Sequence, residues 1–119
     1  MKVAIVDDLQ ADKEILEQYI NRYAAEKSLF IEIECFCSGE HFLKNAAPNK
    51  YRLIFLDIYM KGLDGMQVAE ALRRDDKESL LVFTTSSKDF AIQGYAVKAS
   101  GYLVKPYDYE MFRQTLELI

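Results

Sequence analysis

The chain alternates between short apolar runs and longer segments with helical spacing. Five runs rich in branched or aromatic residues have the length of β-strands. They cover Lys2–Val6, Phe30–Phe36, Arg52–Leu56, Leu80–Phe83 and Tyr102–Val104. Apolar residues three and four positions apart predict a helix after each run. These helices are expected across residues 15–23, 42–46, 66–72 and 88–97, and after Pro106 with Asp108 as its N-cap.

This order of strand and helix, five times over, predicts a parallel sheet with helices on both faces, because each right-handed crossover returns a helix to the sheet. The run Leu53–Leu56 is apolar without alternation, which is typical of a strand buried on both faces. We therefore expect it at the centre of the sheet. The last helix reaches the end of the chain without a stop signal, so we expect a further domain to follow.

Composition restricts the class of protein. With 119 residues, 50% of them hydrophobic, the chain can bury one core and is read as one domain. Its net charge of −4 repels nucleic acid phosphates, so this segment alone is not expected to bind DNA. No signal peptide and no apolar run of about 18 residues is present, and we predict a cytoplasmic protein without membrane contact.

The two cysteines are separated by one residue in a predicted strand. Cys35 and Cys37 are too few for a structural zinc site, and His41 is the only histidine nearby. Because free cysteines are often buried, we predict that both face the core and neither binds metal nor has a redox role.

Polar residues with compatible chemistry follow four of the five strands. The first strand ends in Asp7-Asp8, the third in Asp57, the fourth in Thr84-Thr85 and the fifth in Lys105-Pro106. In an open parallel sheet the carboxyl ends of the strands converge on one ligand site. We therefore expect three carboxylates, a hydroxyl and an ammonium in a single pocket.

Such a cluster suits Mg²⁺ and phosphoryl transfer. Like charges a few ångströms apart raise one another's pKa, and Mg²⁺ prefers carboxylate, phosphate and water oxygens. With the ion bound, Asp57 could act as a carboxylate nucleophile towards an activated phosphoryl group and form an aspartyl phosphate. Lys105 and the metal would then stabilise the charge on the transferring group, and Thr85 would donate a hydrogen bond.

Each of these residues alone has a simpler explanation. Asp8 or Asp12 could be only the N-cap of the first helix, and Thr85 could cap the fourth. Lys105 taken singly is typical of a solvated surface charge. Asp57 is harder to explain in this way, because it ends a wholly apolar strand. The combination of four strand ends therefore carries the hypothesis.

The same residues resemble the motifs of response regulator receiver domains over the whole chain. They are Val6-Asp7-Asp8, Leu56-Asp57-Ile58-Tyr59-Met60 with Gly62, Asp64 and Gly65, Phe83-Thr84-Thr85, and Tyr102-Leu103-Val104-Lys105-Pro106. Residues 83–91 with Tyr95 and Ala99 are similar to receivers joined to LytTR-type DNA-binding domains. The resemblance implies a flavodoxin-like, doubly wound (βα)5 fold with strand order 2-1-3-4-5.

The resemblance also implies a role for each matching residue. Asp57 would be the phosphoacceptor, and Asp8, Asp57 and the Tyr59 carbonyl would bind Mg²⁺ directly, with Asp7 acting through water. Thr85, twenty residues before Lys105, would be the switch hydroxyl, and Tyr102 the aromatic that moves with it. The Lys105-Pro106 bond would be cis.

The expected function is a phosphorylation-dependent switch and not an enzyme, apart from self-catalysed phosphotransfer and dephosphorylation. A sensor histidine kinase would phosphorylate it, and a C-terminal effector, expected to be a DNA-binding transcription regulator, would respond. Tyr95, Tyr102, Tyr107 and Tyr109 suggest a partner or homodimer surface on the fourth helix, fifth strand and fifth helix.

Two alternative functions remain open. One is a receiver-like interaction module that works without phosphorylation, and it would normally lack a pocket residue. The other is a phosphatase of the haloacid dehalogenase type, which typically has an Asp-x-Asp motif after its first strand. Tyr59 and Ser87 stand where the family controls water access, so the lifetime of a phosphorylated state is not predicted. Gly94 in the fourth helix serves either close packing or a loosening of that helix.

Overall fold

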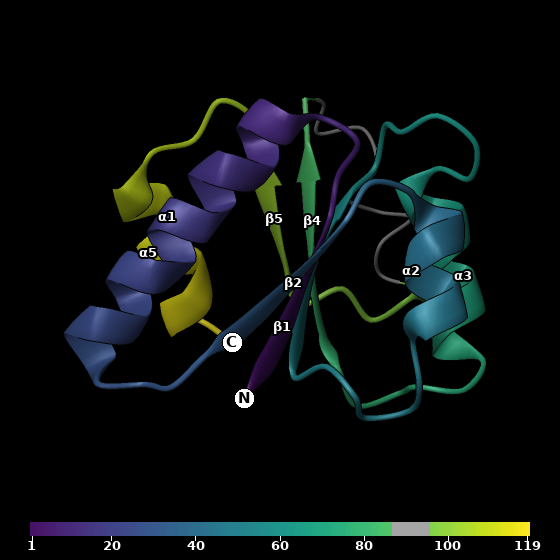
Figure 1. Cartoon of the computed structure of the whole chain (residues 1–119), viewed down its shortest axis with the longest axis horizontal. Helices are drawn as coiled ribbons and strands as arrows, with labels where there is room; N and C mark the ends of the chain where they lie inside the picture. The colour runs from purple at the N-terminus through teal and green to yellow at the C-terminus, as the bar shows by residue number, and fades with distance from the viewer. Residues whose placement is uncertain (87–95) are drawn as a thin grey trace.

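A computed structural model of the chain describes residues 1–86 and 96–119. Its strands lie side by side between two layers of helices (Figure 1). The strands are β1 (Lys2–Val6), β2 (Glu32–Phe36), β3 (Leu53–Asp57), β4 (Leu80–Thr85) and β5 (Gly101–Val104). The helices are α1 (Gln10–Lys27), α2 (Gly39–Asn45), α3 (Gly65–Arg73) and α5 (Tyr109–Glu117). The predicted fourth helix falls mostly on residues outside the described ranges, and so do the predictions made for Ser87, Gly94 and Tyr95.

The five strands form one parallel sheet in the order β2-β1-β3-β4-β5. The expected fold class and the central position of β3 are therefore confirmed. All five residues of β3 are buried, as its unbroken apolar pattern predicted. In the register of the sheet, Asp57 at the end of β3 lies opposite Thr84 of β4.

Each face of the sheet has its own hydrophobic core. Alternate residues of the strands pack under α2 and α3 on one face, where Leu56, Phe83 and Phe42 are fully buried. The other set packs under α1 and α5, with Phe55 stacked on Phe112 at 5.7 Å between ring centroids. Figure 1 shows these two helix layers on opposite sides of the strands. Together they bury the sheet and leave the carboxyl ends of its strands at one rim.

Local capping sets where the helices begin. The Asp108 side chain accepts a hydrogen bond from the Met111 N–H, so the predicted N-cap of α5 is confirmed. Asp64 caps α3 and forms a reciprocal capping box with Gln67. Among the described residues, no helix combines the length and apolar character needed to cross a membrane.

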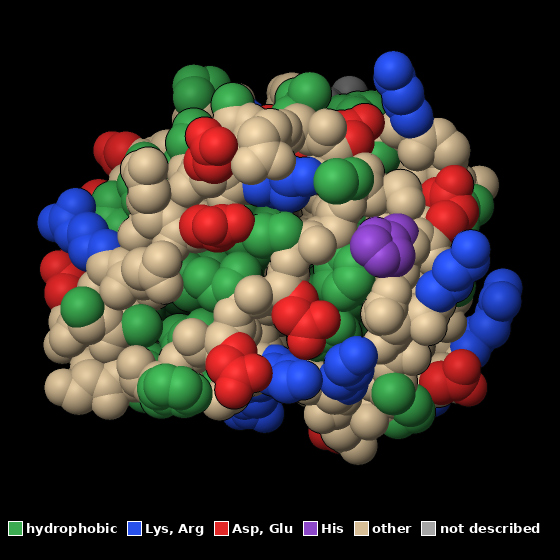
Figure 2. All heavy atoms as spheres, in the orientation of Figure 1, with side chains coloured by type: hydrophobic (Ala, Val, Ile, Leu, Met, Phe, Trp, Pro, Cys, Tyr) green, Lys and Arg blue, Asp and Glu red, His purple; other side chains and the backbone are tan. Residues whose placement is uncertain are grey.

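The prediction that both cysteines face the core is wrong, because Cys35 and Cys37 are exposed. β2 is an edge strand of the sheet, and the Cys35 thiol donates to Glu17 Oε1 of α1 at 2.8 Å. Figure 2 shows hydrophobic side chains between charged ones along the seam between α1 and β2. Lys13 of α1, by contrast, is buried, and its ammonium donates to Cys37 Sγ at 3.1 Å.

Candidate functional site

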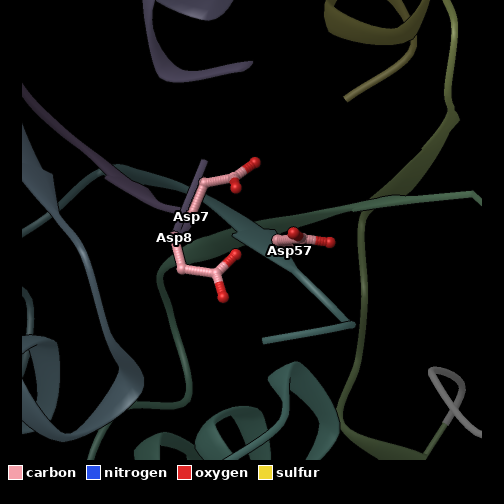
Figure 3. A group of neighbouring side chains, drawn as sticks. All are labelled: Asp7, Asp8 and Asp57. Carbon is pink, nitrogen blue, oxygen red and sulfur yellow. The ribbon is translucent and has the colours of Figure 1, made fainter. Parts of the chain in front are cut away.

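Three carboxylates gather at the rim formed by the ends of β1 and β3. One oxygen each from Asp7, Asp8 and Asp57 lies within 4.8 Å of the others, and Figure 3 shows the three side chains side by side. Asp7 and Asp57 are buried, whereas Asp8 is half-buried. The predicted acidic cluster is thus present among the described residues.

Lys105, which follows β5, brings its ammonium into this cluster. Its Nζ lies 3.4 Å from Asp57 Oδ2, 3.2 Å from Asp7 Oδ2 and 2.7 Å from Asp12 Oδ2. The backbone N–H of Lys105 donates to the Thr85 carbonyl at 2.7 Å, and the Lys105-Pro106 peptide bond is cis, as expected. With its side chain only 20% exposed, Lys105 is not the solvated surface charge that its sequence alone would allow.

Burial and charge shift the pKa values of two members of the site. Burial raises the pKa of Asp57, and the negative charge of Asp7 adds to that effect. Lys105 and the Tyr59 N–H oppose it, and the resulting pKa is about 7, compared with an ordinary 3.8. Burial alone would lower the pKa of Lys105, but its contacts with Asp12, Asp57 and Asp7 outweigh burial and raise it.

Backbone groups hold each carboxylate in position. The Leu9 N–H donates to Asp7 Oδ1 at 2.9 Å, the Lys61 N–H to Asp8 Oδ2 at 3.2 Å, and the Tyr59 N–H to Asp57 Oδ1 at 3.3 Å. These donors come from the loops after β1 and β3. The loops therefore orient the acidic side chains before any ligand arrives.

Gly65 brings the start of α3 against the end of β3. Its N–H donates to the Ile58 carbonyl at 2.8 Å. A Cβ on Gly65 would lie 2.3 Å from the Asp57 carbonyl oxygen, far closer than atoms pack. This position needs glycine because the helix backbone passes so near the strand.

The two threonines at the end of β4 are both buried. Thr85 is fully buried and pairs in register with Val104, next to Lys105. Tyr102 is half-buried with its ring 5.5 Å from that of Phe83. The Thr84 hydroxyl has no hydrogen-bond partner among the described residues, although Thr84 lies directly opposite Asp57.

Asp12 and Tyr107 also lie at the site, although the sequence had not assigned them to it. The residue before α1 is Leu9, with no side-chain capping bond, so neither Asp8 nor Asp12 is its N-cap. Asp12 instead makes the shortest contact to Lys105. Tyr107 lines the same small cavity as Asp12 and Lys105, and burial, followed by the charges of Asp12 and Asp7, raises its pKa. Only the fold brings the segment after β5 against the first turn of α1.

The donor set fits a small divalent cation. Hard cations such as Mg²⁺ prefer carboxylate oxygens, and one loop supplies two of them while β3 supplies the third. A cation between them would also offset the repulsion between Asp7 and Asp57. Lys105 would remain beside such a cation to contact an anionic ligand, a combination suited to phosphoryl chemistry.

Comparison with known proteins identifies similar sequences. A family model described as the response regulator receiver domain matches residues 3–117. The sensory transduction protein LytT of Bacillus anthracis is 31% identical over 117 residues, covering 98% of this chain and 46% of that protein. The positive alginate biosynthesis regulatory protein of Pseudomonas aeruginosa is 33% identical over 117 residues, with the same 98% and 46% coverage. The chain spans about half the length of these curated relatives.

Solved structures agree with the fold. The response regulatory domain of protein mrkE from Klebsiella pneumoniae matches with a TM-score of 0.82 and 30% identity, over 98% of this chain and 93% of that one. The response regulator protein TrrA from Thermotoga maritima, solved in complex with Mg²⁺ and BeF, matches with a TM-score of 0.79 and 24% identity. That match covers 99% of this chain and 98% of TrrA.

Proposed function

Because this chain belongs to the response regulator receiver family, we propose that it is a phosphorylation-dependent switch that carries its phosphoryl group on Asp57. Its similarity to LytT and to the alginate regulator supports the LytTR-type subfamily. The observation that carries the assignment of Asp57 is that its carboxylate lies beside the Asp7-Asp8 pair and 3.4 Å from the Lys105 ammonium.

In the proposed reaction, an Asp57 oxygen forms a bond to phosphorus while the bond from phosphorus to the donor's imidazole nitrogen breaks. The imidazole leaves with the electron pair and takes up a proton. Lys105 would donate to the phosphoryl oxygens, whose negative charge needs a fixed cation in a site with little water. The backbone donors to Asp7 and Asp8 would keep those carboxylates in place throughout.

We assign the metal site to Asp8, Asp57 and the Tyr59 carbonyl, with Asp7 acting through a water molecule. Bound there, Mg²⁺ would neutralise charge on the acceptor and on the phosphoryl group. Tyr59 lies in the loop that follows Asp57, and its N–H donates to the Asp57 carboxylate. This contact keeps the Tyr59 backbone next to the acceptor. A metal-binding assay with Asp8→Asn should give a weaker affinity for Mg²⁺ than the unaltered protein.

The switch would be a shift between two conformations that already exchange. In it, the Thr85 hydroxyl donates to the phosphoryl group, and Tyr102 changes its packing. Support comes from the backbone bond between Lys105 and Thr85, which links the two strand ends that would respond. We propose that the protein acts in the cytoplasm and that its partners are a sensor histidine kinase and a C-terminal effector domain. Two copies would pair through the fourth helix, β5 and α5.

Labelling separates this function from its alternatives. The protein is incubated with Mg²⁺ and ³²P-labelled acetyl phosphate, beside Asp57→Asn and with EDTA as a second control. The proposal expects label only in the unaltered protein with Mg²⁺. Label that persists in Asp57→Asn would refute the assignment, no label in any sample would favour an interaction module, and steady release of phosphate from a simple phosphate ester would favour a phosphatase.

A further inference from the structure

We propose that Asp12 is a displaceable partner of Lys105 that slows phosphorylation of Asp57; this inference rests on the proposed function of Asp57. Asp12 lies in the first turn of α1, outside the Asp7-Asp8 pair. Its Oδ2 lies 2.7 Å from Lys105 Nζ, closer than either Asp7 or Asp57. Without a phosphoryl group, the shortest contact of the Lys105 ammonium is therefore to a carboxylate that is not among the predicted Mg²⁺ ligands.

The hydrogen-bonding capacity of Lys105 makes this contact relevant. An ammonium group has three N–H donors. In the structure, three carboxylate oxygens lie within 3.4 Å of Lys105 Nζ, one from each of Asp7, Asp12 and Asp57. A phosphoryl oxygen arriving above Asp57 can receive a full hydrogen bond from Lys105 only when one of these partners gives way.

Asp12 is the partner best able to leave. The Asp7 side chain is 1% exposed and its other oxygen is held by the Leu9 N–H, whereas the Asp12 side chain is 26% exposed. A cavity of about 120 Å³ adjoins Asp12 and Lys105 and is also lined by Ile15, Pro106 and Tyr107. Asp12 can turn into this space and reach water, while Asp7 keeps its contact with Lys105.

The charge of Asp12 acts in the same direction as its hydrogen bond. Small phosphoryl donors are anions, and a fourth carboxylate beside the site repels them. Removing that charge weakens the repulsion and frees a donor of Lys105 at the same time. Both effects should speed the attack of Asp57, so Asp12 works as a positioning residue that restrains Lys105.

The test measures the initial rate of labelling by acetyl phosphate at fixed Mg²⁺. We expect Asp12→Asn to be phosphorylated about 2- to 5-fold faster than the unaltered protein, the rate change that corresponds to loss of a partly exposed ion pair. Asp12→Ser, a second neutral variant, should also be faster, and Asp12→Glu should restore the slow rate. Glu14→Gln is the matched control, because it removes an exposed carboxylate from the same helix and should leave the rate unchanged.

Circular dichroism and urea denaturation establish that each variant is folded. A rate for Asp12→Asn equal to or below that of the unaltered protein overturns the proposal, as does an equal acceleration in Glu14→Gln, which would indicate a general charge effect. Failure of Asp12→Glu to restore the slow rate also overturns it. Unaltered protein that takes no label overturns the assignment of Asp57 as well, so the two failures are distinguishable.

Discussion

Replacing Asp57 by asparagine should stabilise the metal-free protein above pH 7. The Asp57 side chain is 4% exposed and lies beside Asp7, so its ionised form is costly in the folded state. Burial, with the charge of Asp7 in second place, raises its pKa from 3.8 to about 7. Asparagine has nearly the same shape and no charge, so it removes this cost. Its amide oxygen can still accept from the Tyr59 N–H, whereas the contact in which Asp57 accepts from Lys105 is lost.

The coupling between protonation and folding sets the sign and size of this stability difference. A carboxyl whose pKa is raised on folding favours the folded state at low pH, and this contribution is lost as pH rises from 3.8 towards 7. At 1.36 kcal/mol per pKa unit, a rise from 3.8 to about 7 corresponds to a ceiling of about 4 kcal/mol. Relaxation of the loops reduces this value, and we expect Asp57→Asn to be more stable by about 1 to 3 kcal/mol at pH 8.

Urea denaturation followed by far-ultraviolet circular dichroism measures the difference in EDTA at pH 8 and at pH 4.5. The gain should shrink at the lower pH, where Asp57 is protonated in the folded protein. Mg²⁺ should reduce the stability gain of the variant, since a ligand at one hundred times its Kd stabilises the unaltered protein by about 2.7 kcal/mol and the variant by less. Asp75→Asn, at an exposed position after α3, controls for net charge. The reasoning is refuted if Asp57→Asn is no more stable than the unaltered protein at pH 8 in EDTA.

Three further substitutions test separate parts of the structure. Lys105→Met should lower the free energy of unfolding in EDTA at pH 8 by about 1 to 3 kcal/mol, because it leaves buried carboxylates without their cation; unchanged stability in urea would contradict this. Gly65→Ala should lower the free energy of unfolding by more than about 2 kcal/mol and slow the labelling of Asp57, since the added Cβ would lie 2.3 Å from the Asp57 carbonyl oxygen. Thermal denaturation and acetyl phosphate labelling measure the two effects. An unchanged melting temperature would count against the geometry. Asp76→Ala should lower the free energy of unfolding by about 2 to 4 kcal/mol, because the buried carboxylate accepts from the Ser79 N–H at 2.9 Å. It should not slow the labelling, because Asp76 lies far from the acidic cluster. Slower labelling with normal stability in urea would contradict this.

The sequence predicted the sheet well because hydrophobic patterning carries most of that information. β3 shows why: its unbroken apolar run required burial on both faces, which only a central strand of a parallel sheet provides. The same topology brought Asp7, Asp57 and Lys105 to one rim. These predictions depend on strand order and direction, which local patterns can specify.

The errors and omissions concern side chains whose surroundings depend on how the layers fit together. Cys35 was expected in the core, but it stands on an edge strand, where its thiol is exposed and donates to the Glu17 carboxylate of α1. Lys13 would be expected at the surface, yet it is buried against Cys37. Asp12 looked like a helix-capping residue, and only the path of the chain after β5 makes it a partner of Lys105.

Locating the phosphoryl group on the chain tests the central claim most directly. After treatment with acetyl phosphate and Mg²⁺, borohydride reduces an aspartyl phosphate to homoserine, and peptide mass spectrometry identifies the altered residue. Homoserine is predicted at position 57, with Asp7 and Asp8 unchanged. Homoserine at another aspartate, with position 57 intact, would contradict the assignment of Asp57 as the acceptor.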